Sequence, residues 1–135
     1  MESPYMLVEA GTVGFWLSVE QIERVRDFQI LDEGMVPVYA MDQLCGSGFG
    51  GNPYILILHV ENERFGIAVE KVEGIHSIRQ EEIYPLPRLV KNHENQYLHG
   101  IVWDMANGRR SGYLLSVPMF LERSKKWQPV GWLDN

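Results

Sequence analysis

The sequence predicts a mainly β protein made of two small lobes, and two observations carry this prediction. Short runs rich in β-branched and aromatic residues recur along the chain and are bounded by Gly, Asn, Asp or Pro, the pattern of strands and turns. In addition, residues 15–25 align without a gap with residues 65–75, fifty positions later. A repeat of this length is typical of a duplicated supersecondary unit.

Seven runs are predicted to be strands. In chain order they are Tyr5–Val8, Val13–Leu17, Val36–Ala40, Tyr54–Val60, Arg64–Val69, Leu98–Trp103 and Gly112–Val117. Glu61-Asn62-Glu63 is a short connection that predicts a hairpin between the fourth and fifth of these runs. Asn107-Gly108 predicts another hairpin before Gly112, because Asn-Gly favours tight turns.

Short helical turns are expected between the strands. Val19, Ile22 and Val25 are spaced three apart, and the second copy repeats this spacing at residues 69–75, which favours a turn of helix after each copy's strand. Further turns are predicted at Met41–Cys45 and at Pro118–Arg123. Proline is well tolerated in the first turn of a helix, where its missing N–H costs nothing.

The chain of 135 residues is expected to be a single domain. The repeat divides it into a first lobe at about 1–46, a Gly-rich linker at 46–53, a second lobe at about 54–123 and a C-terminal tail at 124–135. A lobe of about 50–80 residues buries too little surface to be comfortably stable alone. We therefore expect the two lobes to pack on each other.

Composition excludes several classes of protein. The net charge of −6 lacks the basic balance that usually accompanies nucleic-acid binding. Cys45 is the single cysteine, so no disulfide can form within the chain, and a reducing cytoplasmic setting fits. No run approaches the roughly 18 apolar residues that a membrane span needs. We expect a cytoplasmic protein that binds no nucleic acid and inserts into no membrane.

No catalytic or metal site is predicted. The four histidines are dispersed without ligand spacing, at His59, His76, His93 and His99. The acidic pair Glu20/Glu23 recurs as Glu70/Glu73, and recurrence in both copies favours a structural role on exposed faces over acid–base chemistry. We therefore expect no enzyme activity, no metal and no cofactor.

The ordered series of motifs resembles the CheW-like family, the adaptor domain of bacterial chemotaxis arrays. Ile55–Leu58 followed by Arg64–Val72 resembles the family's second-lobe hairpin and its GL-x-VD-x-V pattern, with Glu70 where Asp is usual. Ile83–Pro87, Leu98–Asp104 and Gly112–Leu121 resemble, in turn, its Pro-rich connection, its GV strand and its closing strand with a short helix.

The first copy of the repeat is the shorter one. Val36–Leu44 resembles the family's VPVIDL segment, with Ala40 where Asp is usual. The interval from Val25 to Val38 is 13 residues, whereas the interval from Ile75 to its counterpart Leu114 is 39, so the first copy lacks about 26 residues. This is room for two strands, and the resemblance implies that the missing stretch would carry the family's GVINLRG segment.

The resemblance implies two SH3-like five-stranded β-barrels packed side by side, the first of them incomplete here. It also implies a non-catalytic adaptor in chemotaxis-type, two-component signal transduction. Its partners would be methyl-accepting chemoreceptors and the regulatory domain of a CheA-like histidine kinase, which has the same fold, docked through strand edges and an apolar groove between the lobes. The candidate partner-binding residues are those that the deletion should leave less covered: Phe15, Leu17, Ile22, Val25, Val36 and Val38.

The tail carries two large aromatic residues, Trp127 and Trp132. They either pack on the protein's own surface, covering core that the short first lobe leaves open, or are presented to a partner. Two alternatives to the adaptor also stay open. Two chains could complete each other's shortened lobe as a homodimer, or the groove between the lobes could hold a small ligand.

Overall fold

The computed structural model describes residues 2–11, 13–40, 53–91, 95–103 and 111–134. Its elements, in chain order, are β1 (Glu2–Ala10), β2 (Val13–Ser18), η1 (Val19–Gln21), β3 (Ile22–Asp27), β4 (Val36–Ala40), β5 (Tyr54–Val60), β6 (Glu63–Val69), β7 (Lys71–Arg79), η2 (Gln80–Glu82), β8 (Ile83–Tyr84), β9 (Leu98–Val102), β10 (Gly112–Leu115), α2 (Val117–Ser124) and β11 (Gly131–Leu133).

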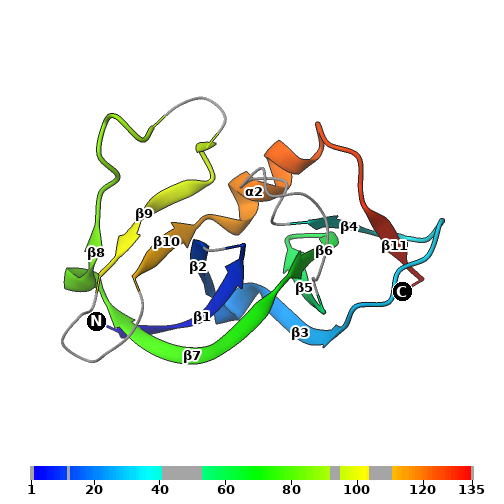
Figure 1. Cartoon of the computed structure of the whole chain (residues 1–135), viewed down its shortest axis with the longest axis horizontal. Helices are drawn as coiled ribbons and strands as arrows, with labels where there is room; N and C mark the ends of the chain where they lie inside the picture. The colour runs from blue at the N-terminus through cyan, green and yellow to red at the C-terminus, as the bar shows by residue number, and fades with distance from the viewer. Residues whose placement is uncertain (1, 12, 41–52, 92–94, 104–110, 135) are drawn as a thin grey trace.

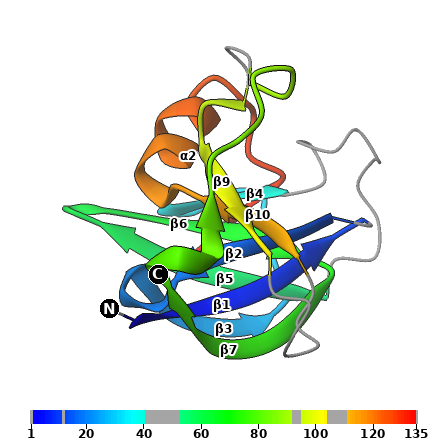
Figure 2. The ribbon, with the colours of Figure 1, turned by 90° about the vertical axis from the view of Figure 1, so that its left-hand side faces the viewer.

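The strands form two sheets that lie side by side along the long axis of the molecule (Figure 1). The six-stranded sheet has the order β7-β1-β2-β10-β9-β8, and the five-stranded sheet has the order β11-β4-β6-β5-β3. Helix α2 lies above the junction of the sheets (Figures 1 and 2). The predicted mainly β architecture with two units is confirmed.

Helix α2 confirms the turn that was predicted at Pro118–Arg123. Ser116 is its N-cap, because its Oγ accepts a hydrogen bond from the Met119 amide at 3.4 Å, and a proline stands in the first turn. The helix has eight residues, and no helix in the described part of the chain is long and apolar enough to cross a membrane.

Each sheet combines a hairpin from one copy of the repeat with later strands from the other copy. The β1–β2 hairpin is flanked by β7 and β10, and the β5–β6 hairpin is flanked by β3 and β4. The limits predicted for the lobes along the chain, 1–46 and 54–123, therefore do not coincide with the limits of the sheets.

Strand pairing repeats at the fifty-residue interval seen in the sequence. Met6 lies opposite Leu17 in the first hairpin, and Leu56 lies opposite Ile67 in the second. The parallel pairs β10–β2 and β4–β6 are equivalent in the same way.

The parallel pairs also locate the deletion. Leu114 lies opposite Trp16, and Val38 lies opposite Gly66. Trp16 and Gly66 are fifty residues apart, so Leu114 and Val38 are counterparts, as the sequence predicted. The first copy reaches this position about 26 residues sooner than the second.

The helical turn predicted after the second copy's strand is wrong. Residues 71–79 form strand β7, and in the first copy η1 covers three residues before β3 begins. The three-residue apolar spacing has another cause: Val69 ends β6, Val72 is partly buried on β7, and Ile75 is on the exposed face of β7. A bulge where Gly74 has a φ of 117° shifts the register of β7 against β1, but exposed and less exposed residues still alternate along β7.

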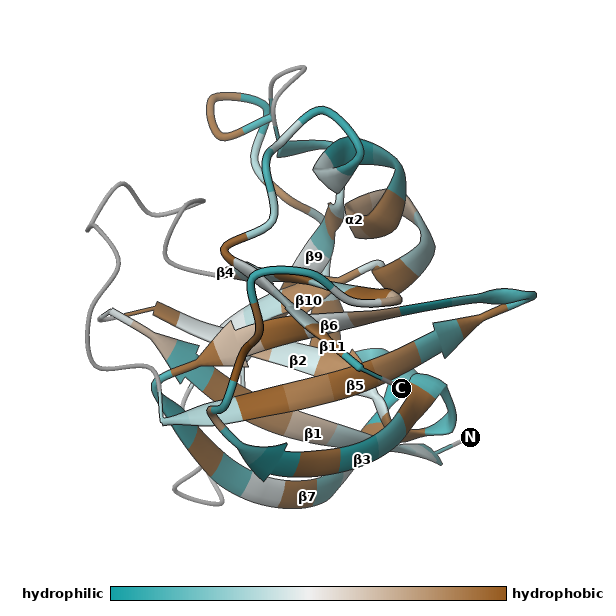
Figure 3. Cartoon of the chain, turned by 90° about the vertical axis from the view of Figure 1, so that its right-hand side faces the viewer, coloured by the Kyte–Doolittle hydropathy of each residue, from teal (hydrophilic) through white to brown (hydrophobic). Residues whose placement is uncertain are grey.

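Strand β5 shows how the two sheets share a core. Its run Ile55–Leu58 is buried throughout, and Figure 3 shows this strand as a long hydrophobic band. Leu56 and Leu58 belong to the most extensive cluster of buried side chains, whereas Ile55 and Ile57 belong to a separate one. Successive side chains of a strand point to opposite faces, so β5 has buried side chains on both faces.

The shared core confirms that the two units pack on each other. It takes Val8 and Phe15 from the first hairpin, Phe65 from the second and Phe120 from α2. Phe65 and Phe120 stack with ring centroids 6.2 Å apart. Each sheet has, in addition, a smaller cluster of its own, around Trp16 in the six-stranded sheet and around Val38 in the five-stranded sheet.

Several expectations fall on residues outside the described ranges. They are the turn at Met41–Cys45, most of the Gly-rich linker at 46–53, His93 and the Asn107-Gly108 turn.

Candidate interaction surface

The structure divides the six predicted partner-binding residues into two groups. Four are buried side chains: Phe15, Leu17, Val36 and Val38. Ile22 is partly buried against the shared core, and Val25 is 37% exposed. Only the last two, both on β3, reach the surface.

The burial of Val36 and Val38 has a specific cause. Strand β11, from the C-terminal tail, pairs with β4 so that Gly131 lies opposite Val38 and Leu133 opposite Val36. Leu133 is 2% exposed and packs in the same cluster as the two valines. The deletion was expected to leave this position open, but the tail covers it.

Strand β11 occupies the place that β9 holds in the other sheet. Gly100 lies opposite Leu114 on β10, just as Gly131 lies opposite Val38 on β4. Leu114 and Val38 are counterparts, so the two glycines are counterparts as well. Because both pairs are antiparallel, the tail replaces the missing strand in the same direction as well as in the same place.

The replacement extends to the neighbouring strand. In the six-stranded sheet β8 flanks β9, with Tyr84 opposite Ile101. In the five-stranded sheet Leu31 forms an isolated bridge to Trp132. The Leu31 amide donates to the Trp132 carbonyl at 2.8 Å, and the Trp132 amide donates back at 3.0 Å.

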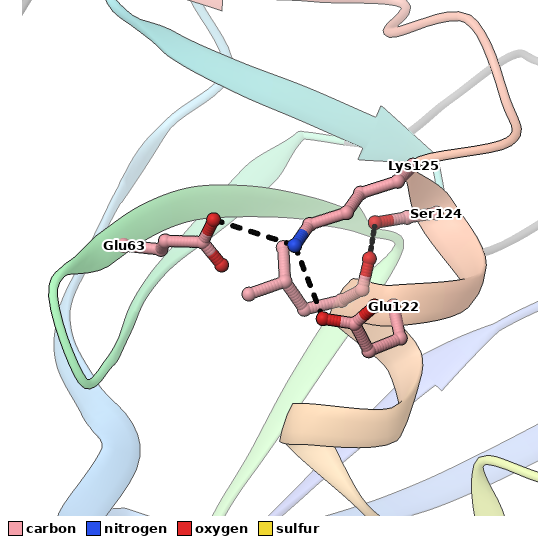
Figure 4. A network of polar contacts seen from close by, with 5 residues as sticks. Glu63, Glu122, Ser124 and Lys125 are labelled. Carbon is pink, nitrogen blue, oxygen red and sulfur yellow. Dashed lines mark hydrogen bonds and ion pairs between the residues drawn. The ribbon is translucent and has the colours of Figure 1, made fainter.

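The tail is also fixed where it leaves α2. Trp127 packs edge-on against Phe120, with ring centroids 5.7 Å apart. Lys125 Nζ lies 3.0 Å from Glu122 Oε1 and 3.4 Å from Glu63 Oε1, so it links α2 to the β5–β6 turn (Figure 4). The hydrogen bond to Glu122, supported by Glu63, raises the pKa of Lys125 above its ordinary value.

Self-packing of the tail tryptophans is therefore what the structure shows. Trp127 is partly buried against the shared core, and Trp132 lies within a paired strand. The homodimer alternative needed a second chain to complete the short copy. In the structure the chain's own tail takes that position.

The apolar side chains left at the surface include an equivalent pair. Val25 on β3 is 37% exposed, and Ile75, fifty residues later on β7, is 56% exposed. Strands β3 and β7 follow one another along the lower side of the molecule in Figure 1 and lie together at the lower side in Figures 2 and 3. We call the exposed side chains of these two strands the edge-strand surface.

Sequence reasoning named Val25 but missed Ile75. The signal was present, because the repeat places Ile75 at the position of Val25. The candidate residues were chosen in the first copy alone, because that copy carries the deletion. Both copies expose this position on an edge strand of their sheet.

Charged residues of both signs accompany these apolar side chains. On β3, Glu23 accepts a hydrogen bond from Arg64 Nη2 at 2.6 Å. This hydrogen bond, supported by the charges of Arg64 and Arg24, lowers the pKa of the Glu23 carboxyl. On β7, Lys71, Glu73 and Arg79 are exposed. Charges on edge strands discourage unspecific strand pairing.

The acidic pairs do not form a site. Glu20, Glu23, Glu70 and Glu73 are all exposed, as the preferred interpretation of the repeat predicted. Among the described residues, no group of three or more His, Cys, Asp or Glu side chains is placed to hold a metal ion.

One hollow of about 640 Å³ lies between residues 86–91 and 95–99 on one side and Met119 of α2 on the other, rather than between the two sheets. His99 and Met119 border it, with Nε2 and Sδ 3.2 Å apart. The small-ligand alternative placed its pocket between the lobes, and this hollow does not occupy that place.

Comparisons with known proteins agree on one family. A family model described as CheW-like domain matches residues 16–125. Among solved structures, the scaffolding protein TtCheW from Thermoanaerobacter tengcongensis superimposes with a TM-score of 0.69 at 15% sequence identity, covering 85% of this chain and 89% of that one. A search of curated proteins gave no match.

Proposed function

The chain belongs to the CheW-like domain family, and from this we propose that it is a non-catalytic adaptor that couples chemoreceptors to a CheA-like histidine kinase in the cytoplasm. The family consists of scaffold proteins of chemotaxis signalling. The single observation that carries the proposal is the family match, which spans most of the chain.

The edge-strand surface supports a binding role. Val25 and Ile75 are large apolar side chains exposed among charged neighbours. Apolar anchors inside a polar rim are typical of protein interfaces. Each side chain lies on an edge strand of a sheet, where a partner can approach without unfolding the protein.

The proposal differs from the sequence-based set in which residues touch the partner. Val36 and Val38 are buried in a core cluster with Leu133 of β11, the strand that pairs with β4. On β3, Val25 remains a candidate contact residue, with Ile22 next to it at the border of the core. On β7, Ile75 is added to the candidates. We propose that Val25 and Ile75 carry the contact with the kinase regulatory domain or the receptor.

A titration with each purified partner tests the proposal. The partners are the regulatory domain of the cognate CheA-like kinase and a cytoplasmic fragment of the cognate receptor, and calorimetry measures the affinity. Val25→Asp and Ile75→Asp should each weaken binding at least about tenfold, as expected when a central apolar anchor is lost. Gln96→Asp, an exposed change of equal charge away from β3 and β7, is the matched control.

Each result has a distinct meaning. If neither partner binds the unchanged protein at high micromolar concentration, the adaptor function is contradicted. If both bind and the two variants behave like Gln96→Asp, the adaptor function stands and the edge-strand surface is not its interface.

A further inference from the structure

Strand β11 is held by backbone hydrogen bonds on both sides, as a bound peptide strand would be. On one side it pairs with β4, and the Val130 amide donates to the Val38 carbonyl at 2.8 Å. On the same side the Met35 amide donates to the Leu133 carbonyl at 2.9 Å, and on the other side Leu31 and Trp132 exchange two hydrogen bonds. When a peptide adds to a sheet as an extra strand, its main-chain hydrogen bonds to the sheet supply the affinity.

The residues that receive β11 are remote from it in sequence. They are β4 and residues 30–35, all in the first third of the chain, whereas β11 follows α2. We call the space between β4 and residues 30–35 the strand slot. Its two walls belong to one continuous segment of chain, so the slot is defined by residues other than those that fill it.

The slot selects side chains at alternate positions of its occupant. Gly131 is buried, and a Cβ at this position would lie 2.6 Å from Ile30 Cβ, closer than real carbon contacts allow. Leu133, two residues later on the same face, is buried among Val36, Ile55 and neighbouring apolar residues. Trp132, between them, is only partly buried.

The other sheet shows that this selection belongs to the position. Gly100 occupies the equivalent site of β9, where a Cβ would lie 2.7 Å from the Tyr84 carbonyl oxygen. Val102, two residues later, is fully buried, as Leu133 is nearly. Glycine followed two residues later by an aliphatic side chain is thus the pattern that fits both places.

We propose that the strand slot is a binding site for extended peptides that carry glycine followed two residues later by an aliphatic residue. The resident ligand is the chain's own β11, and the C-terminal segment of a second copy is the ligand that replaces it. Residues 125–130 tether the resident strand. A short tether gives an effective concentration near millimolar, so the chain's own strand normally excludes competitors.

The test uses the full chain carrying Gly131→Val, which cannot seat its own strand against Ile30. A fluorescently labelled peptide of residues 127–135 is titrated against this variant and against the unchanged protein, with anisotropy as the readout. We expect binding at least about tenfold tighter to the variant, because the resident strand competes in the unchanged protein. The same peptide carrying Gly131→Val is the matched control and should bind neither.

Two results of this titration would overturn the proposal. One is a folded variant, shown by circular dichroism, that does not bind the peptide. The other is equal binding of the glycine and valine peptides, since that would mean association without the slot.

If the variant does not fold, hydrogen exchange on the unchanged protein tests whether β11 separates from the strand slot. A separable strand opens locally, so the amides of Leu31, Met35, Val130 and Trp132 should exchange at least about tenfold faster than those of Ile57 and Ile67. Equal rates in the two groups would mean that β11 leaves only when the whole protein unfolds, and the proposal would fail.

Discussion

The two sheets of this protein are made from the same repeated unit and differ in how each obtains its outer strands. In the six-stranded sheet β8 and β9 follow β7 along the chain. In the five-stranded sheet the corresponding stretch is absent, and Leu31 with β11 occupies the two places. The comparison teaches that the fold requires the position beside β4 to be filled, whichever part of the chain fills it.

The cores of the two sheets differ at one central position. Trp16 is fully buried in the six-stranded sheet, and its counterpart in the five-stranded sheet is Gly66. A Cβ on Gly66 would already lie 2.9 Å from Ile55 Cγ2. The same backbone unit is therefore packed around one large side chain in one sheet and around several aliphatic side chains in the other.

Removing the large side chain should have the greatest effect. Trp16→Ala should lower the free energy of unfolding by about 3–5 kcal/mol, because it leaves a cavity in a well-packed core. Urea denaturation measures the change. Trp103→Ala, at a side chain that is 55% exposed, is the control and should cost less than about 1 kcal/mol. Equal losses would mean that Trp16 does not organise the six-stranded sheet.

The tail strand offers the next comparison. Leu133→Ala removes a nearly buried side chain from the five-stranded sheet and should cost about 2–3 kcal/mol in urea denaturation. Val102→Ala makes the corresponding change in the six-stranded sheet and should cost about 1–2.5 kcal/mol, since fewer atoms are removed. Asp134→Ala, at an exposed neighbour, is the control. A negligible loss for Leu133→Ala would contradict a structural role for β11.

The sequence predicted the parts of the fold that rest on local pattern. The Ile55–Leu58 run and its neighbours gave the β5–β6 hairpin, and the fifty-residue interval gave the correspondence of Leu114 with Val38. Strand β7 was missed because the apolar side chain of Ile75 lies on its exposed face, which obscures the alternation of the strand in the sequence. Strand β11 was missed because three residues between Val130 and Asp134 carry no periodicity, although covering the first lobe was one of the two roles considered for the tail.

The candidate surface was harder to predict, because it depends on the pairing of β11 with β4. Val36 and Val38 look uncovered when only the deletion is considered, and a pairing between residues 131–133 and β4 is a tertiary fact with no local signature. Ile75, by contrast, was within reach of sequence reasoning, because the repeat that identified Val25 also identifies its counterpart.

The smallest expected effect concerns a charge pair present in one sheet only. Glu23 on β3 bonds to Arg64 on β6, and the position equivalent to Arg64 in the other hairpin is Gly14, which has no side chain to offer. The bond lowers the pKa of the Glu23 carboxyl below its ordinary value. The pair therefore contributes stability above the pKa that Glu23 has in the unfolded chain, and this contribution is lost as pH falls through the lowered pKa of the folded state.

Titration of the Glu23 side chain by NMR measures this effect directly. In the unchanged protein its midpoint should lie below that of an ordinary exposed glutamate, and in Arg64→Met it should return toward the ordinary value, because the hydrogen bond is the leading cause of the shift. Adding salt should move the midpoint in the same direction but less far, since an exposed pair is screened while its hydrogen bond persists. An unchanged midpoint in Arg64→Met would show that the hydrogen bond from Arg64 is not the cause of the lowered pKa of Glu23.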